Sequence, residues 1–67
     1  MGNVGDRIAM NPKILGGKPI IKGTRISIEF ILELLASGMS VENIIKEYSH
    51  LKREDVLAAV AYALKTL

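Results

Sequence analysis

Residues 27–38 read SIEFILELLASG, and from this point the apolar residues follow a helical spacing instead of short runs. Apolar side chains at positions i, i+3, i+4 and i+7 line one face of an amphipathic helix. The residues at this spacing are Ile28, Ile31, Leu32 and Leu35. Ser27 can cap the first turn with its hydroxyl, and Gly38 can end the helix in the left-handed conformation. The segment predicts a helix between Ser27 and Gly38.

Two further helices are expected downstream. Ser40 can cap a short second helix over 41–48, where the apolar residues repeat the same spacing. A third helix is expected from Lys52 or Arg53 to Leu64. Two short helices joined by about three residues, after a packing helix, are the arrangement of a helix-turn-helix DNA reader. A plain three-helix bundle has the same spacing, and both interpretations are open at this point.

The third helix is apolar all round, since Tyr62 holds the only polar side-chain atom between Val56 and Leu64. We expect its inward face to consist of Val56, Leu57, Val60 and Leu64. A helix of this kind is normally buried on more than one side. The second side is covered by the N-terminal strands or by another subunit, and small residues favour the close approach of a subunit. We therefore predict a homodimer interface formed by Ala58, Ala61, Tyr62 and Ile20.

The segment before the first helix is rich in turn formers. Residues 1–25 hold five of the six glycines and both prolines, and short apolar runs lie between them. β-branched residues bounded by turn formers are typical of short strands. The runs at 8–10, 14–15 and 19–21 therefore predict a small hairpin or meander.

Length and composition limit what can stabilise the chain. With 67 residues it is expected to form one domain, 1–67, mostly α, with a hairpin or meander over 1–26 and a three-helix core over 27–67. So small a domain usually needs disulfides, a metal or a partner subunit. The chain has no cysteine and one histidine, which leaves a partner subunit. The absence of cysteine also fits a reducing cytoplasm, and we expect a cytoplasmic protein without a targeting signal or membrane anchor.

The charge is unevenly distributed. Residues 1–25 hold five Lys or Arg and one Asp, a net charge of +4, whereas 26–67 holds four basic and six acidic residues, a net charge of −2. A basic half can bind a nucleic-acid backbone, although lysines on short strands also prevent edge-to-edge pairing. We predict DNA contacts, mostly with phosphates, at Lys18, Lys22, Arg25, Lys52 and Arg53. Base reading by the third helix is not expected, because its outer face would carry Glu54, Asp55 and alanines.

The residue types argue against catalysis. General acid–base catalysis needs titratable groups in contrasting environments, and we expect each Asp and Glu on a helix surface or terminus. A zinc site needs three or four ligands, whereas His50 stands alone in a turn. The run 16–25 lacks the glycine order of a nucleotide-binding loop. We therefore expect no enzyme activity, cofactor, metal or small-molecule substrate.

Several short motifs resemble one known family. They are Asn11-Pro12, Gly16-Gly17-Lys18-Pro19, Ile21-Lys22-Gly23-Thr24-Arg25, Leu35-Ala36-Ser37-Gly38-Met39-Ser40, and Leu51 followed by Glu54-Asp55-Val56 and Ala58-Ala59. Together they span most of 8–64, and the chain resembles the family catalogued as domain of unknown function 433. The resemblance implies a small helix-turn-helix protein with a homeodomain-like or winged-helix-like core. Some members are regarded as antitoxins, or as the DNA-binding part of antitoxins, whose partners are PIN-domain ribonucleases.

The chain departs from the family pattern at Lys52. Relatives usually carry Thr or Ser at the start of the third helix, where a hydroxyl caps the helix and stabilises it by about 1 kcal/mol. A lysine cannot cap in this way, but it brings a basic side chain to the position. Thr24 and Arg25 belong to the family signature, and two roles are open for them. They lock the corner between strand and helix, or Arg25 contacts DNA.

Two functions are compatible with these expectations. The first is a homodimeric, DNA-binding, antitoxin-like regulator that represses its own promoter and neutralises a PIN-type toxin ribonuclease. The second is a protein-interaction module that docks a partner through its apolar third helix without binding DNA. The salt dependence of binding distinguishes the two functions, because phosphate contacts weaken as the salt concentration rises whereas apolar docking does not.

Overall fold

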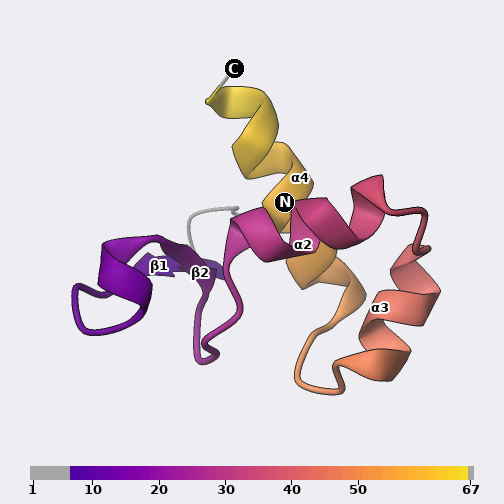
Figure 1. Cartoon of the computed structure of the whole chain (residues 1–67), viewed down its shortest axis with the longest axis horizontal. Coiled ribbons are helices and arrows are strands. Elements are labelled where there is room, and N and C mark those ends of the chain that lie inside the picture. The colour runs from indigo at the N-terminus through magenta and orange to yellow at the C-terminus, as the bar shows by residue number, and fades with distance from the viewer. Residues whose placement is uncertain (1–6, 67) are drawn as a thin grey trace.

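The computed structural model describes residues 7–66, in which a short hairpin lies beside three helices (Figure 1). The elements in chain order are β1 (Ile8–Met10), the 3-10 turn η1 (Leu15–Gly17), β2 (Pro19–Ile21), α2 (Ile28–Ala36), α3 (Val41–Glu47) and α4 (Arg53–Lys65). The prediction of a mostly α fold with an N-terminal hairpin and a three-helix core is confirmed.

The N-terminal strands form a two-stranded hairpin, one of the two expected arrangements, and not a meander. β1 and β2 pair antiparallel, with Ile8 opposite Ile21. The predicted strand at 14–15 is wrong, because the chain makes a tight turn there. Leu15 and the two glycines that follow it all have positive φ, between 51° and 88°, which is a left-handed conformation outside the strand region.

Thr24 fixes the corner between β2 and α2. Its hydroxyl donates a hydrogen bond to the carbonyl of Ile21 over 2.7 Å and accepts one from the N–H of Ile26 over 3.0 Å. The chain then reaches Ser27, whose hydroxyl accepts a hydrogen bond from the N–H of Phe30 over 2.9 Å. This is the predicted N-cap, and α2 therefore begins directly after the corner.

The remaining helix ends also have identifiable causes. At the start of α3, the hydroxyl of Ser40 accepts a hydrogen bond from the N–H of Asn43 over 3.1 Å. After α2, Gly38 has a φ of 103°, as a glycine at this position allows. At the start of α4, the carboxylate of Asp55 accepts a hydrogen bond from the N–H of Lys52 over 2.9 Å. The N-terminus of α4 is thus capped by a carboxylate in the first turn of the helix, and not by a hydroxyl at the N-cap position.

The core lies between β2 and the three helices. α2 crosses α4, and the C-terminal turns of α4 extend beyond α2 (Figure 1). The buried residues at the centre are Ile21, Ile28, Ile31, Ile44, Leu51, Val56 and Ala59. The rings of Phe30 and Tyr48 meet edge to face with their centroids 5.6 Å apart. This contact and the buried Leu51 fix the loop that leads into α4.

The buried face of α4 differs from the predicted one. We expected Leu57 and Leu64 to face the other helices, and this is wrong, because their exposed fractions are 54% and 66%. Val56 and Ala59 are completely buried. At about 100° per residue, the two leucines point away from the face that Val56 and Ala59 define. Periodicity could not separate these faces, since apolar residues occupy both.

Candidate nucleic-acid interface

Two loops reach the same end of the molecule. The loop after β2, residues 22–27, and the loop between α3 and α4, residues 48–52, both extend to the lower edge of the view in Figure 1. They share an open groove of about 620 Å³, which Thr24 and Arg25 line from the first loop and His50 lines from the second. Three exposed cations stand on these loops, and we call them the basic end: Lys22, Arg25 and Lys52.

Arg7 connects the two loops. Its carbonyl accepts a hydrogen bond from the N–H of Lys22 over 2.8 Å, and its guanidinium Nη1 lies 2.9 Å from Oδ1 of Asp55. Oδ2 of Asp55 accepts a hydrogen bond from the N–H of Lys52 over 2.9 Å. Asp55 is only 6% exposed, so this pair is screened less than a surface pair. Arg7 and Asp55 therefore hold the backbones of Lys22 and Lys52 in a fixed relation.

The five predicted DNA contacts have different surroundings. Nζ of Lys18 lies 3.0 Å from Oε1 of Glu29, and Arg53 donates a hydrogen bond to Glu42. The three cations of the basic end form no ion pair with any other residue in the described range, 7–66. Exposed ion pairs contribute little to stability, so a phosphate can replace Glu29 or Glu42. At the basic end no carboxylate of the described residues has to be displaced.

The contact of Arg53 with α3 influences the titration of Glu42. The hydrogen bond from the Arg53 guanidinium, followed by a backbone hydrogen bond and the guanidinium charge, lowers the pKa of Glu42. Glu42 therefore remains ionised further into the acid range than an ordinary glutamate. Arg53 is directed towards α3, at the border of the basic end.

The structure brings together only part of the predicted DNA-contact set. Lys22 and Arg25 belong to the loop after β2 and Lys52 to the loop before α4, and these two loops reach one end of the molecule. Lys18 instead lines a second groove, together with Glu29 of α2 and Tyr62 of α4. The candidate interface is therefore smaller than the predicted one and is centred on the two loops.

A family model described as a protein of unknown function, DUF433, matches residues 8–63. The chain belongs to this family. The match includes both loops of the basic end and all of α4 except its last two residues. The resemblance that the sequence motifs indicated is thereby confirmed.

Two relatives show the extent of the similarity. The uncharacterized protein y4eO of Sinorhizobium fredii (strain NBRC 101917 / NGR234) is 34% identical over 56 residues, which are 84% of this chain. A crystal structure of a DUF433 member protein from Anabaena variabilis ATCC 29413 matches with a TM-score of 0.84 at 27% identity and covers 88% of this chain. This chain spans 25% of the length of y4eO and 58% of the Anabaena chain.

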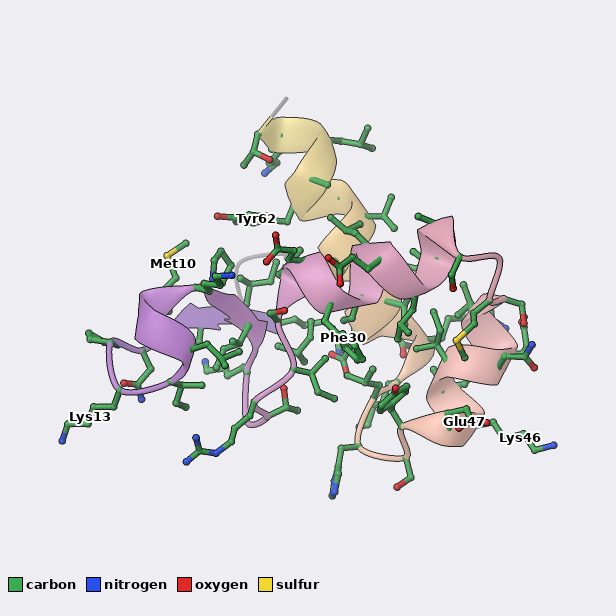
Figure 2. The ribbon with its side chains drawn as sticks, in the orientation of Figure 1. Met10, Lys13, Phe30, Lys46, Glu47 and Tyr62 are labelled. Atoms are coloured by element: carbon green, nitrogen blue, oxygen red, sulfur yellow. The ribbon has the colours of Figure 1, made fainter. Side chains whose placement is uncertain are left out.

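The DUF433 fold places the predicted dimer-interface residues differently from our expectation. Ile20 and Ala58 are 2% and 5% exposed, so they offer almost no surface to a partner. Tyr62 leaves α4 on the side of the hairpin (Figure 2) and packs against the core. Ala61 is half-buried and stays accessible. Of the other apolar residues of α4, Leu57 and Leu64 are exposed, and Val60 and Ala63 are half-buried like Ala61 and Tyr62.

Sequence reasoning missed the pair of Arg7 and Asp55. We expected Asp55 on the outer face of the third helix, and this is wrong, because its contacts with Arg7 and Lys52 turn it inward. The paired residues are 48 positions apart, and no local pattern predicts such a contact. The available signal was an acidic residue at the third position of a helix, where a carboxylate can accept the N-cap N–H.

Two other kinds of site have no counterpart in the described residues. Between residues 7 and 66, no three side chains of His, Asp or Glu come close enough to hold a metal ion. None of the helices in the same range is both long and apolar enough to cross a membrane.

Proposed function

We propose that this DUF433 chain is the DNA-binding part of an antitoxin-type transcriptional regulator, which acts in the cytoplasm as a homodimer. The supporting observation is the basic end, where Lys22, Arg25 and Lys52 are exposed on two loops that share a groove and pair with no carboxylate of residues 7–66. Cations clustered in this way attract a phosphate backbone.

In this proposal most contacts are made with phosphates. The exposed face of α4 offers Leu57, Ala61 and Leu64 where a base-reading helix would present Arg, Asn or Gln. Phosphate contacts fix the position of the protein but carry no sequence information directly. Sequence preference then depends on DNA shape and on Arg25, whose guanidinium can bond two acceptors of a guanine.

The antitoxin role is supported by the family resemblance. In the proposal, this chain supplies the DNA contacts and a PIN-domain ribonuclease is the partner that the regulator neutralises. An adjoining reading frame for a protein with several spaced acidic residues, suited to bind magnesium, would support this role. A neighbouring reading frame of another kind would remove the antitoxin role from the proposal and leave only DNA binding.

A fluorescence anisotropy titration tests DNA binding. The chain is titrated against a labelled duplex from its own upstream region and against a scrambled duplex, each at two salt concentrations. We expect tighter binding to its own sequence and a salt slope that reflects the number of phosphate contacts. Lys22→Ala, Arg25→Ala and Lys52→Ala should each reduce the slope by about one unit.

Lys46→Ala is the matched control, because Lys46 is exposed on α3 and points away from the rest of the chain (Figure 2). It should leave the slope unchanged. Equal weak binding to both duplexes, with a slope that none of the three substitutions alters, would contradict the proposal.

One observation favours a second candidate function, a protein-interaction module that does not bind DNA. Leu57 and Leu64 are both more than half exposed on one helix, as in a helix that docks a partner. This candidate requires association that is insensitive to salt and no preference for any duplex. The titration above therefore separates the two functions.

A further inference from the structure

The outer face of α4 carries a continuous apolar stripe, which we call the α4 stripe: Leu57, Val60, Ala61 and Leu64. These positions follow the spacing i, i+3, i+4 and i+7, so they form one row along the helix. The two leucines are exposed and the other two residues are half-buried. Part of the row lies on the C-terminal turns that extend beyond α2 (Figure 1). A single exposed leucine is ordinary, whereas a continuous row indicates an interaction surface.

We propose that a second copy of this chain covers the α4 stripe, with the two α4 helices packed antiparallel. The orientation is set by two exposed charges that flank the stripe, Glu54 at the start of α4 and Lys65 at its end. They are 11 positions apart, so at about 100° per residue they lie within about 20° of each other around the helix axis. Neither residue forms an ion pair with another residue of the described chain.

The twofold axis of an antiparallel pair keeps the same edge of both helices on one side. Glu54 of one copy then meets the partner's Lys65, and the same contact recurs at the other end. In a parallel pair the twofold axis runs along the helices, so Glu54 and the partner's Glu54 lie on opposite edges of the interface and neither meets a Lys65. The charges of α4 are thus complementary to a second copy in one orientation.

The sizes of the stripe residues agree with this arrangement. Ala61 lies at the middle of the stripe, where a small side chain permits close approach of the two helices. Leu57 of one copy then packs against the partner's Leu64. With a rise of 1.5 Å per residue, this register brings Glu54 to within about 3 Å, measured along the axis, of the partner's Lys65. Long side chains span such an offset easily.

The inference rests on the homodimer of the proposed function and specifies its interface. It covers the outer face of α4, which carries no base-reading side chain. It leaves accessible the basic end, whose three cations stand on loops outside the stripe. The claim of an α4 dimer interface and the claim of DNA binding by the basic end can therefore fail separately, provided that dimer formation is measured without DNA.

Single-cysteine crosslinking tests the interface, because the natural chain contains no cysteine. Ala61→Cys should give a covalent dimer in high yield with a short bismaleimide, since the two copies of this position lie near the twofold axis. Lys46→Cys, exposed on α3, is the matched control and should give no covalent dimer. Equal crosslinking of the two variants, or none in either, would overturn the inference.

Charge exchange tests the orientation, with association measured by sedimentation velocity without DNA. Glu54→Lys and Lys65→Glu should each raise the dimer Kd by roughly fivefold or more, because each converts two attractive contacts into repulsive ones. An equimolar mixture of the two variants should regain the wild-type Kd, since every contact between them is again attractive. A mixture that associates no better than its components, or a wild-type chain that is monomeric at high micromolar concentration, would overturn the inference.

The same variants separate failure of the interface from failure of the proposed function. If the mixture fails to associate while Arg25→Ala still reduces the salt slope on DNA, the interface is wrong and DNA binding stands. If the mixture associates but Lys22→Ala, Arg25→Ala and Lys52→Ala all leave the salt slope on DNA unchanged, the interface stands and the proposed function is wrong.

Discussion

The two faces of α4 carry similar side chains but meet different surroundings. Val56 and Ala59 are completely buried, whereas the larger Leu57 and Leu64 are more than half exposed. Smaller residues on the inner face let α2 and α4 approach closely. An ordinary surface helix places its large apolar residues inward, and α4 places two of them outward. We therefore expect the inner face of α4 to stabilise the fold and the outer face to mediate association with a second copy.

The largest effect should come from a charge on the inner face. Val56→Asp buries a carboxylate without a partner, which should cost about 4 kcal/mol or more of the free energy of unfolding. A domain of this size cannot retain its fold after such a loss. Leu57→Asp, one position further, should change the free energy of unfolding by at most about 0.5 kcal/mol. Circular dichroism of dilute protein should find Val56→Asp unfolded without urea, and urea unfolding measures the free energy of unfolding of Leu57→Asp. Equal destabilisation of the two variants would refute the assignment of faces.

The neighbouring carboxylates Asp55 and Glu54 allow the inner and outer faces of α4 to be compared with polar side chains. Asp55→Ala removes the buried partner of Arg7 and of the Lys52 N–H, and should cost about 2 kcal/mol, because Arg7 is partly exposed and can be hydrated. Glu54→Ala should stay within about 0.5 kcal/mol of the wild type. A double-mutant cycle of Asp55→Ala with Arg7→Ala measures their coupling. Additive effects would show that the ion pair contributes nothing.

Lys52→Thr should sharpen the contrast between stability and binding. A hydroxyl at this N-cap should raise the free energy of unfolding by up to about 1 kcal/mol. The same change removes one cation from the basic end, and the salt slope of DNA binding should fall by about one unit. Urea unfolding and the anisotropy titration, performed on one preparation, should therefore change in opposite senses. A slope equal to that of the wild type would remove Lys52 from the interface.

The smallest expected effect concerns the exposed pair of Glu42 and Arg53. Because Arg53 lowers the pKa of Glu42 in the folded chain, the carboxylate contributes to stability above its unfolded pKa. The contribution is lost as the pH falls through the lowered folded pKa. The effect is small, since water and salt screen an exposed pair. Glu42→Gln should be slightly less stable than the wild type at neutral pH, and urea unfolding in acid should find the two equal.

The sequence predicts those parts of the fold that depend on local contacts. Ser27 and Ser40 accept hydrogen bonds within their own helices, so a pattern of a few residues is sufficient to find them. The turn at 15–17 is less predictable, because a pair of glycines can follow a strand as well as form a left-handed turn. The faces of α4 could not be distinguished, since apolar residues follow one another around the whole helix.

The candidate site was also predictable only where it depends on local sequence. The basic residues of the two loops are visible in the sequence, and so is the excess of positive charge before Arg25. The pairing of Lys18 with Glu29 and of Arg7 with Asp55 depends on how distant elements pack. Neither contact has a local signature. The sequence therefore identified the cations, and only the fold showed which of them share one end.

The most direct test is an NMR titration of the isotopically labelled chain with a duplex from its own upstream region. At low salt, the amide signals that move most should belong to 22–26 and 49–53, at the basic end. Those of 57–64 should move little. Shifts concentrated along 57–64 would mean that the outer face of α4 contacts DNA and would contradict the account, as would the absence of any shift.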